Sequence, residues 1–248
     1  MVRLLAFLCC LALPAQAEEI VSDLSRDEVS INATFNGSDI LVFGAVRRDA
    51  PEPDGRLGVI ITVAGPKEDI TVRKKDRKFG IWVNTEEAEI VEVPSFYAVA
   101  TSAPLARVLS DGADASEGIT FGQVVHGIAG EDVNAAAFEE ALIRIKSDQS
   151  KFQLNDGDVS LSRGTLFSTS IELPANLTEG YYRTRILLTR DGEVVDRYET
   201  AIPVQKVGIE RWLYNLARQM PFWYGIMSLA IAISAGWLAS AVFSLARR

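Results

Sequence analysis

The chain has 248 residues, of which 48% are hydrophobic and 23% are charged, and this composition excludes long intrinsic disorder. A formal net charge of −8 argues against nucleic-acid binding, because contacts with phosphate backbones require a basic excess. Two cysteines and one histidine are too few for most zinc sites and for thiol or histidine catalysis.

Residues 1–17 have the pattern of a secretory signal peptide. A single arginine precedes the apolar run LLAFLCCLAL, and Ala15-Gln16-Ala17 supplies the small-x-small motif that signal peptidase cleaves. The run is too short to cross a bilayer, which takes about 20 residues. Both cysteines lie in this run, so a mature chain that starts near Glu18 would have no disulfide and would depend on burial for its stability.

Residues 18–103 have the alternation and the turn signals of a small β-sandwich module. Apolar and polar residues alternate along 28–35, and Asn36-Gly37 is a strong hairpin signal because both residues accept positive φ. Leu57–Ala64 is apolar on both faces, which predicts a central strand.

Residues 104–151 are predicted to be a helical segment. Apolar residues recur at helical spacing along Ala135–Lys146, with charged residues between them, which indicates an amphipathic helix. Ser110–Gly118 is rich in Asp, Gly and Ser and is predicted to be a loop. His126 is expected to be a partly buried structural residue, because neither a second histidine nor a mature cysteine could complete a metal site.

Residues 152–207 are predicted to form a second β module. Asp191-Gly192 is another type I′ turn signal between two strand-like runs. Gly180-Tyr181 before these paired strands is similar to the last strands of an immunoglobulin-like sandwich, in which a tyrosine closes the corner. The predicted fold is therefore mainly β, with two immunoglobulin-like or β-sandwich modules, a helical middle segment and one C-terminal transmembrane helix.

One basic cluster is a candidate contact surface. It lies between two strand-like runs, and its residues are Lys74, Lys75, Arg77 and Lys78, with Trp82 close behind. One interpretation is a loop that touches anionic headgroups or an acidic partner. The alternative is a solvated hairpin tip whose charges keep an exposed edge from pairing.

The C-terminal residues are predicted to attach the chain to a membrane. We expect an interfacial amphipathic helix at 208–220, a transmembrane helix at 221–244 and a cytoplasmic tail at 245–248. Docking of the amphipathic helix on the soluble domain is the alternative to an interfacial position. The aromatic residues expected at the membrane interface are Trp212, Tyr214, Trp223, Tyr224 and Trp237.

The topology follows from these two ends. A signal peptide directs the domain after it out of the cytoplasm, and the C-terminal span then stops transfer. In a bacterium, the chain would be a single-pass protein of the inner membrane, with most of its mass periplasmic and its C-terminus cytoplasmic.

The predicted span also has a face of small residues. Ser228, Ala232, Gly236 and Ser240 recur every fourth position, which places them in one ridge of a helix. Small residues allow the backbones of two membrane helices to approach closely. The ridge therefore predicts packing against an integral membrane protein or self-association.

Catalytic signatures are missing from the sequence, which contains no Gly-x-Ser-x-Gly, Ser-x-x-Lys or Gly-rich phosphate loop. No catalytic residue, cofactor or metal ligand is therefore predicted. We expect a non-catalytic, membrane-anchored periplasmic accessory protein that partners an integral membrane transporter. The alternatives are a carboxylate-dependent envelope hydrolase, which requires two facing acids in a cleft, and a solute-binding module of an exporter, which requires a closed apolar pocket.

Several short stretches of the chain carry a family resemblance. They include the sequences FNG, ILVFG, VAGP, GIWVN and VPSFYAV in the first half, and FEEALIR, YRT and GIE in the second. With these stretches, nearly all of the mature chain resembles a family of alphaproteobacterial transmembrane proteins to which no activity is assigned. The resemblance implies an exported domain with one C-terminal span. Such families are sometimes encoded beside exporters of the sulfite-exporter type, which is why a transporter is the expected partner.

Overall fold

The computed structural model describes residues 18–25, 28–31, 36–126, 128–129, 135–206 and 209–246. The predicted signal peptide at 1–17 and the final two residues of the predicted tail lie outside the described residues. The chain divides into two compact units. The first contains residues 36–204 and the N-terminal strand, and the second contains residues 205–248 with the short segment 30–35.

The first unit contains a four-stranded sheet and most of a six-stranded sheet. The order in the larger sheet is β2 (Val29–Ile31), β13 (Glu193–Lys206), β12 (Gly180–Arg190), β4 (Leu57–Ala64), β7 (Tyr97–Thr101) and β9 (Phe152–Asn155). The order in the smaller sheet is β1 (Glu18–Leu24), β3 (Ser38–Arg48), β11 (Leu166–Leu173) and β10 (Ser160–Ser162). The predicted mainly β fold is confirmed.

The expected division into two β modules is wrong, because strands from both predicted modules pair within the same sheets. Strand β11 pairs with β3 in the smaller sheet, and β12 pairs with β4 in the larger one. Residues 18–103 and 152–207 therefore build one body together. Alternation within a strand shows which residues face inward, but it carries no information about which distant strand will complete the hydrogen-bond ladder.

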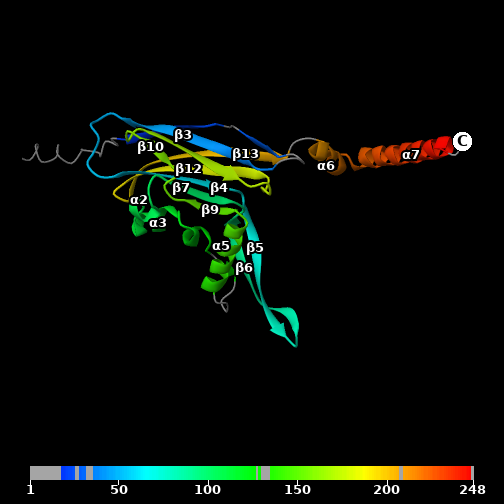
Figure 1. Cartoon of the computed structure of the whole chain (residues 1–248), viewed down its shortest axis with the longest axis horizontal. Coiled ribbons are helices and arrows are strands. Elements are labelled where there is room, and N and C mark those ends of the chain that lie inside the picture. Colours follow the sequence, from blue (N-terminus) through cyan, green and yellow to red (C-terminus); the bar gives the residue numbers. More distant parts are fainter. Residues whose placement is uncertain are drawn as a thin grey trace, which may run out of the picture. The chain divides into compact units, whose positions relative to one another are not determined.

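The larger sheet is covered on both faces. Ile60 of β4 and Leu187 of β12 lie in one core cluster with Phe138 and Leu142 of the helical segment. Side chains alternate along a strand, so Val59, Ile61 and Val63 point to the opposite face, where the smaller sheet lies (Figure 1). All three are fully buried, which confirms the predicted central strand.

The helical segment contains α2 (Leu105–Val108), α3 (Asp111–Glu117), α4 (Phe121–Val124) and α5 (Ala135–Asp148), together with the two-residue strand β8 (Ile128–Ala129). The amphipathic helix predicted at Ala135–Lys146 is confirmed by α5. The loop predicted at Ser110–Gly118 is wrong, because α3 occupies most of it. Ser110 caps this helix by accepting a hydrogen bond from the Ala113 N–H. Acidic residues in the first turn stabilise the helix further by interacting with the positive end of its dipole.

The expectation that Tyr181 closes a corner before the last paired strands is wrong, because the neighbouring Tyr182 occupies that place. The hydroxyl of Tyr182 donates to the Thr178 carbonyl oxygen at 3.0 Å, and its ring is fully buried beside Phe96. Burial raises the pKa of Tyr182 to about 12. Tyr181, which the sequence pattern favours, is 72% exposed.

The second unit contains two helices, α6 (Ile209–Gln219) and α7 (Pro221–Ala246). Pro221 occupies the first position of α7, where its missing N–H costs no helical hydrogen bond. Within the described residues, Pro221–Ser240 is the one helical stretch long and apolar enough to cross a membrane, with a mean hydropathy of 1.5 and none of it buried. The predicted single C-terminal apolar helix is confirmed.

Candidate interaction site

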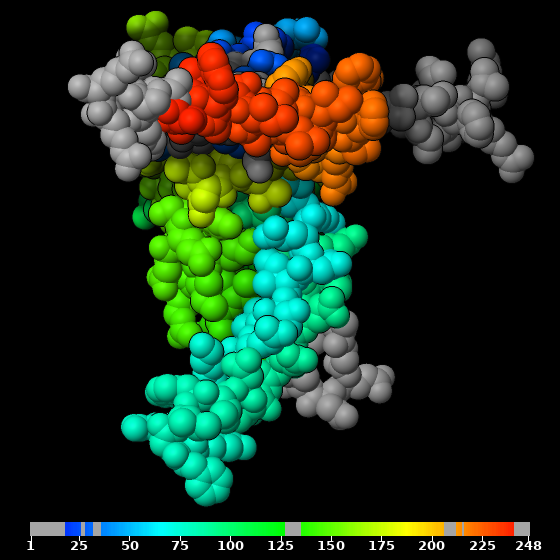
Figure 2. Space-filling view, turned by 90° about the vertical axis from the view of Figure 1, so that its right-hand side faces the viewer, coloured from blue at the N-terminus to red at the C-terminus, as the bar shows by residue number. Residues whose placement is uncertain are grey.

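A long β-hairpin projects from the body of the first unit (Figures 1 and 2). It consists of β5 (Lys67–Lys78) and β6 (Ile81–Pro94), which pair antiparallel over their whole length. Twelve residues in β5 correspond to a strand about 40 Å long. The basic cluster, expected between two strand-like runs, lies within β5, and the two strands continue to a turn at Phe79-Gly80.

The root of the hairpin is fixed to the body. Val72, Ala88, Ile90 and Val93 belong to the core cluster that also contains α5. Lys146 of α5 is buried, and its ammonium group donates to the Glu68 carboxylate at 2.7 Å. Burial lowers the pKa of Lys146, although its bond to Glu68 opposes that shift. The root is therefore held by both apolar packing and a partly buried ion pair.

Beyond Val72 the hairpin leaves the core, and its charges become progressively less compensated. Near the core, Arg73 pairs with Glu87 at 3.0 Å and Lys74 with Glu86 at 2.9 Å. Further out, no carboxylate lies across the ladder from the remaining cations. The residues opposite Lys75, Arg77 and Lys78 are Asn84, Trp82 and Ile81. Within the described part of the chain, these three cations make no ion pair.

The hairpin turns at Phe79-Gly80, and both residues have positive φ, 53° and 87°. A type I′ turn requires this conformation, which Asn and Gly adopt readily and a bulky residue such as phenylalanine adopts at a cost. The Phe79 side chain is nevertheless fully exposed, at 106%. Ile81 and Trp82 beside it are 65% and 69% exposed. We call residues 75–82 the hairpin tip.

The structure brings the predicted contact residues together, with one exception. Lys75, Arg77, Lys78 and Trp82 lie in the hairpin tip, whereas Lys74 is neutralised by Glu86. Phe79 and Ile81 also lie in the hairpin tip, although they are absent from the residues predicted to form a contact surface. A signal was present, because Phe79 lies between Lys78 and Gly80, directly after a basic cluster that itself predicts an exposed hairpin tip.

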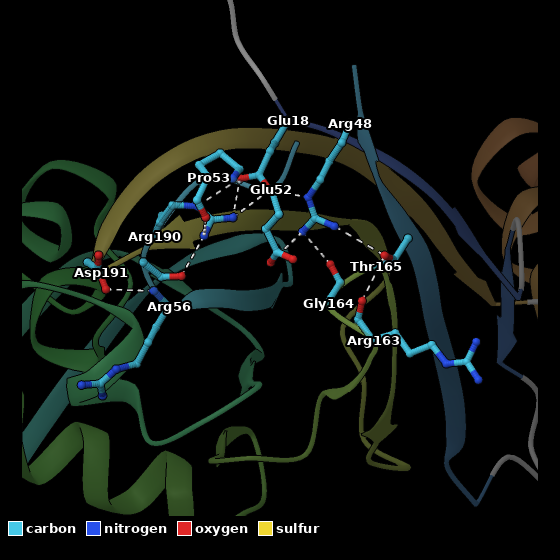
Figure 3. Close-up of polar contacts among 11 residues, drawn as sticks. Glu18, Arg48, Glu52, Pro53, Arg56, Arg163, Gly164, Thr165, Arg190 and Asp191 are labelled. Atoms are coloured by element: carbon cyan, nitrogen blue, oxygen red, sulfur yellow. Dashed lines mark hydrogen bonds and ion pairs between the residues drawn. The ribbon is translucent and has the colours of Figure 1, made fainter. Parts of the chain in front are cut away.

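A buried carboxylate lies at the start of β1, far along the chain from its partners (Figure 3). Glu18 accepts hydrogen bonds from Arg48 of β3 at 2.7 Å and from Arg190 of β12 at 2.8 Å. The side chain of Glu18 is only 4% exposed. Burial alone would raise the pKa of Glu18, but the hydrogen bonds and charges of the two arginines outweigh it and lower the pKa below its usual range. This cluster connects the two sheets.

The arginines of this cluster also bind backbone carbonyls of loops. Arg190 donates to the carbonyl oxygens of Pro53 and Gly55, both at 2.8 Å, and Arg48 donates to that of Gly164 at 2.6 Å. The donors of both guanidinium groups are thus used to hold the chain in place, and the cluster is a structural clamp.

Other carboxylates near this clamp are also engaged. Glu19 pairs with Arg47, and Asp196 accepts from the Ile20 N–H at 2.7 Å. Three of the acids that line a nearby cleft, Glu18, Glu19 and Asp196, therefore have structural partners. Within the described residues, no group of three or more His, Cys, Asp or Glu side chains is arranged to hold a metal ion.

A cavity of about 420 Å³ lies between the hairpin root, α4 and the start of β12. Its cations are already engaged: Lys67 pairs with Glu92 at 2.9 Å, and Arg185 donates to the Glu117 carbonyl oxygen at 2.9 Å. This charged lining differs from the closed apolar pocket that a solute-binding module requires. His126 lines the cavity and is exposed, which corrects the expectation that it is partly buried.

The residues predicted to contact the membrane lie on α6 and α7, and their side chains are exposed. Trp212, Tyr214, Trp223, Tyr224 and Trp237 are exposed by 38% to 72%. The ridge residues Ser228, Ala232, Gly236 and Ser240 are also exposed, and a Cβ at Gly236 would meet no atom within 4 Å. The helix-packing and interfacial roles of these residues stay predictions.

A mainly β body followed by one exposed apolar helix defines a class of single-span membrane protein. The comparison with protein families agrees: residues 19–245 match the family described as "Putative transmembrane protein" (Alph_Pro_TM). The chain belongs to this family, which confirms the resemblance found in the sequence. A search of curated proteins found no match to this chain.

We expect Glu18→Gln to destabilise the body by about 3 kcal/mol at neutral pH, because it leaves two buried guanidinium groups without their anion. A carboxylate with a lowered pKa in the folded state contributes its full stability above its unfolded pKa of about 4.3, and loses it as the pH falls through the folded value. The difference between the two proteins should therefore shrink in acid. Denaturant unfolding at several pH values measures both effects.

The matched control is Glu19→Gln. Glu19 and its partner Arg47 are both more than half exposed, so we expect a loss below about 0.5 kcal/mol. Equal losses of unfolding free energy in the two variants would show that the clamp at Glu18 contributes no more stability than an exposed ion pair.

We expect Phe79→Asn to stabilise the outer hairpin by about 0.5–1 kcal/mol, because Asn-Gly suits a type I′ turn better than Phe-Gly. Hydrogen exchange of the amides on both sides of the turn measures this as slower exchange. As a control, Gly80→Ala should speed exchange, since it forces a Cβ into positive φ at a position with open space around it. Faster exchange in Phe79→Asn would show that the phenylalanine stabilises the turn.

Proposed function

We propose that this chain is a non-catalytic accessory protein of the bacterial inner membrane, which α7 anchors and whose hairpin tip makes the functional contact. The observation that carries the proposal is the tip itself. Three exposed apolar side chains, Phe79, Ile81 and Trp82, are grouped with three unpaired cations at the end of a projecting hairpin. Large apolar side chains grouped on an exposed surface are typical of contact sites.

The proposed location depends on the two ends of the chain. Residues 1–17 would be removed as a signal peptide during export, so that the β body lies in the periplasm. Residues 221–244 would then cross the inner membrane and leave residues 245–248 in the cytoplasm. Residues 208–220 would lie at the outer surface of that membrane, where Trp212 and Tyr214 suit the headgroup region.

The second contact that we propose is made inside the bilayer. The ridge of Ser228, Ala232, Gly236 and Ser240 would pack against a helix of an integral membrane protein, for which a transporter is our candidate. Lipid provides no hydrophobic drive for helices to associate, so close packing through small residues supplies the attraction. Binding of one chain through two such surfaces would make each contact effectively intramolecular once the other has formed.

A reporter enzyme that is active only in the periplasm, fused after Lys206, should be active in living cells. A second fusion of the same reporter at the C-terminus should be inactive, because α7 would place it in the cytoplasm. Activity of a cytoplasm-specific reporter at Lys206 would overturn the proposed topology.

Replacing Ala232 and Gly236 with leucine should reduce crosslinking between α7 and its partner by about tenfold, because two leucines hold the helices apart. Photo-crosslinkers placed on α7 of the full chain in native membranes measure this. Ile226→Leu and Ile233→Leu form the control pair, which preserves volume on the same helix. Unchanged crosslinking in the Ala232 and Gly236 variant would remove the ridge from the proposal.

A further inference from the structure

We propose that the hairpin tip inserts into a membrane surface rich in anionic lipid. The inference rests on the proposed function, since it names the ligand of the same tip. It follows from the order of side chains along the hairpin. Paired charges lie near the body, and unpaired cations lie beyond them, at the level of Ile81 and Trp82 on the facing strand. Phe79 lies at the extreme end and is fully exposed.

This order matches the layers of a membrane surface. Trp and Phe are favoured at the boundary between headgroups and acyl chains, and Lys and Arg are favoured at the level of anionic headgroups. Lys78 and Lys75 lie one and four residues before Phe79, so their backbones are set back by about 3 to 13 Å along the strand. That distance is comparable to the depth of about 5–10 Å at which interfacial elements bury their apolar groups.

The position of Phe79 favours lipid over a protein partner. Its side chain is fully exposed at the outermost position of a convex turn, so a protein would have to provide a pocket deep enough for Phe79, Ile81 and Trp82 together. A bilayer interface needs no such pocket, because lipids rearrange around an inserted group. The positive φ of Phe79 holds this ring at the end of the hairpin despite the conformational cost.

The length of the hairpin reduces the electrostatic repulsion between the acidic body and an anionic membrane surface. The chain has a net charge of −8, and an acidic body would be repelled by an anionic surface. Val72, the last buried residue of β5, lies three residues before Lys75 and six before Lys78, which separates the cations of the tip from the core by about 10 to 20 Å. The Debye length at physiological ionic strength is about 8 Å, so most of the body's repulsion is screened at that distance.

The fluorescence of Trp82 provides a direct test, since the chain has only four tryptophans. Trp212→Phe, Trp223→Phe and Trp237→Phe leave Trp82 as the single tryptophan and keep the tip unchanged. This full chain is placed in nanodiscs of phosphatidylcholine and titrated with vesicles that contain brominated lipid, either with or without phosphatidylglycerol. We expect blue-shifted and quenched Trp82 emission only with the anionic vesicles.

Two triple variants that lose the same charge test whether the tip cations themselves, and not the overall charge of the protein, bind the anionic vesicles. Lys75→Gln, Arg77→Gln and Lys78→Gln remove the unpaired cations and should weaken vesicle affinity by about 100-fold, at roughly fivefold for each cation at the surface. Lys67→Gln, Arg73→Gln and Lys74→Gln remove cations that are paired with glutamates, and should weaken it by less than about fivefold. All six positions are exposed, and circular dichroism checks that both variants fold.

Each remaining outcome overturns the proposal in a distinguishable way. Trp82 emission that no vesicle changes would exclude lipid as the ligand, and so would equal losses in the two triple variants. If Trp82 is shielded only when native membrane proteins are added, the tip binds a protein, and the proposed accessory function survives without the lipid contact. If nothing shields Trp82, both the lipid contact and the tip's role in the proposed function fail.

Discussion

The pairing of strands that are distant in the sequence is the constraint on which the rest of the structure depends. β4 and β12 lie at the centre of the larger sheet, with apolar side chains buried on both faces. Side chains buried on both faces of a sheet are out of reach of a binding partner, so a contact surface is expected on elements that leave the core. The β5–β6 hairpin is such an element: its root is part of the core, and its outer half is free to carry charge and aromatic side chains.

Charged residues have three different roles in this protein. At Glu18 they are buried and fully bonded, which connects β1, β3 and β12. Along the middle of the hairpin they are exposed and paired, where each pair contributes little stability but keeps the net field small. At the tip, Lys75, Arg77 and Lys78 are exposed and make no ion pair with any residue that the structure describes, and with Asp76 they leave a net positive charge there. The same residue types therefore act as clamp, spacer and contact, according to burial and pairing alone.

Two of the groups of exposed apolar side chains suit a protein working at a membrane. α7 presents a continuous apolar surface along about 30 Å of helix, the thickness of a bilayer core. The hairpin tip presents a small apolar group surrounded by cations, which suits the membrane surface rather than its interior. An anchor and a separate surface contact would restrict the orientation of the β body, a geometry that fits an accessory role more readily than catalysis.

Many of the helices, strands and turns of this protein can be predicted from local sequence patterns, because each depends mainly on residues close to it in the chain. The apolar run of β4, the helical spacing of α5 and the uncharged stretch of α7 each determine their own structure, and so does the turn at Asp191-Gly192. Tertiary structure alone decided that residues 18–103 and 152–207 share two sheets, and that Glu18 meets Arg190 across the body. The basic cluster illustrates the difference. Lys74 and Lys75 are identical neighbours in sequence, but an irregularity in the ladder places Glu86 opposite the first and Asn84 opposite the second. Which cation stays unpaired depends on cross-strand register, which no local pattern encodes.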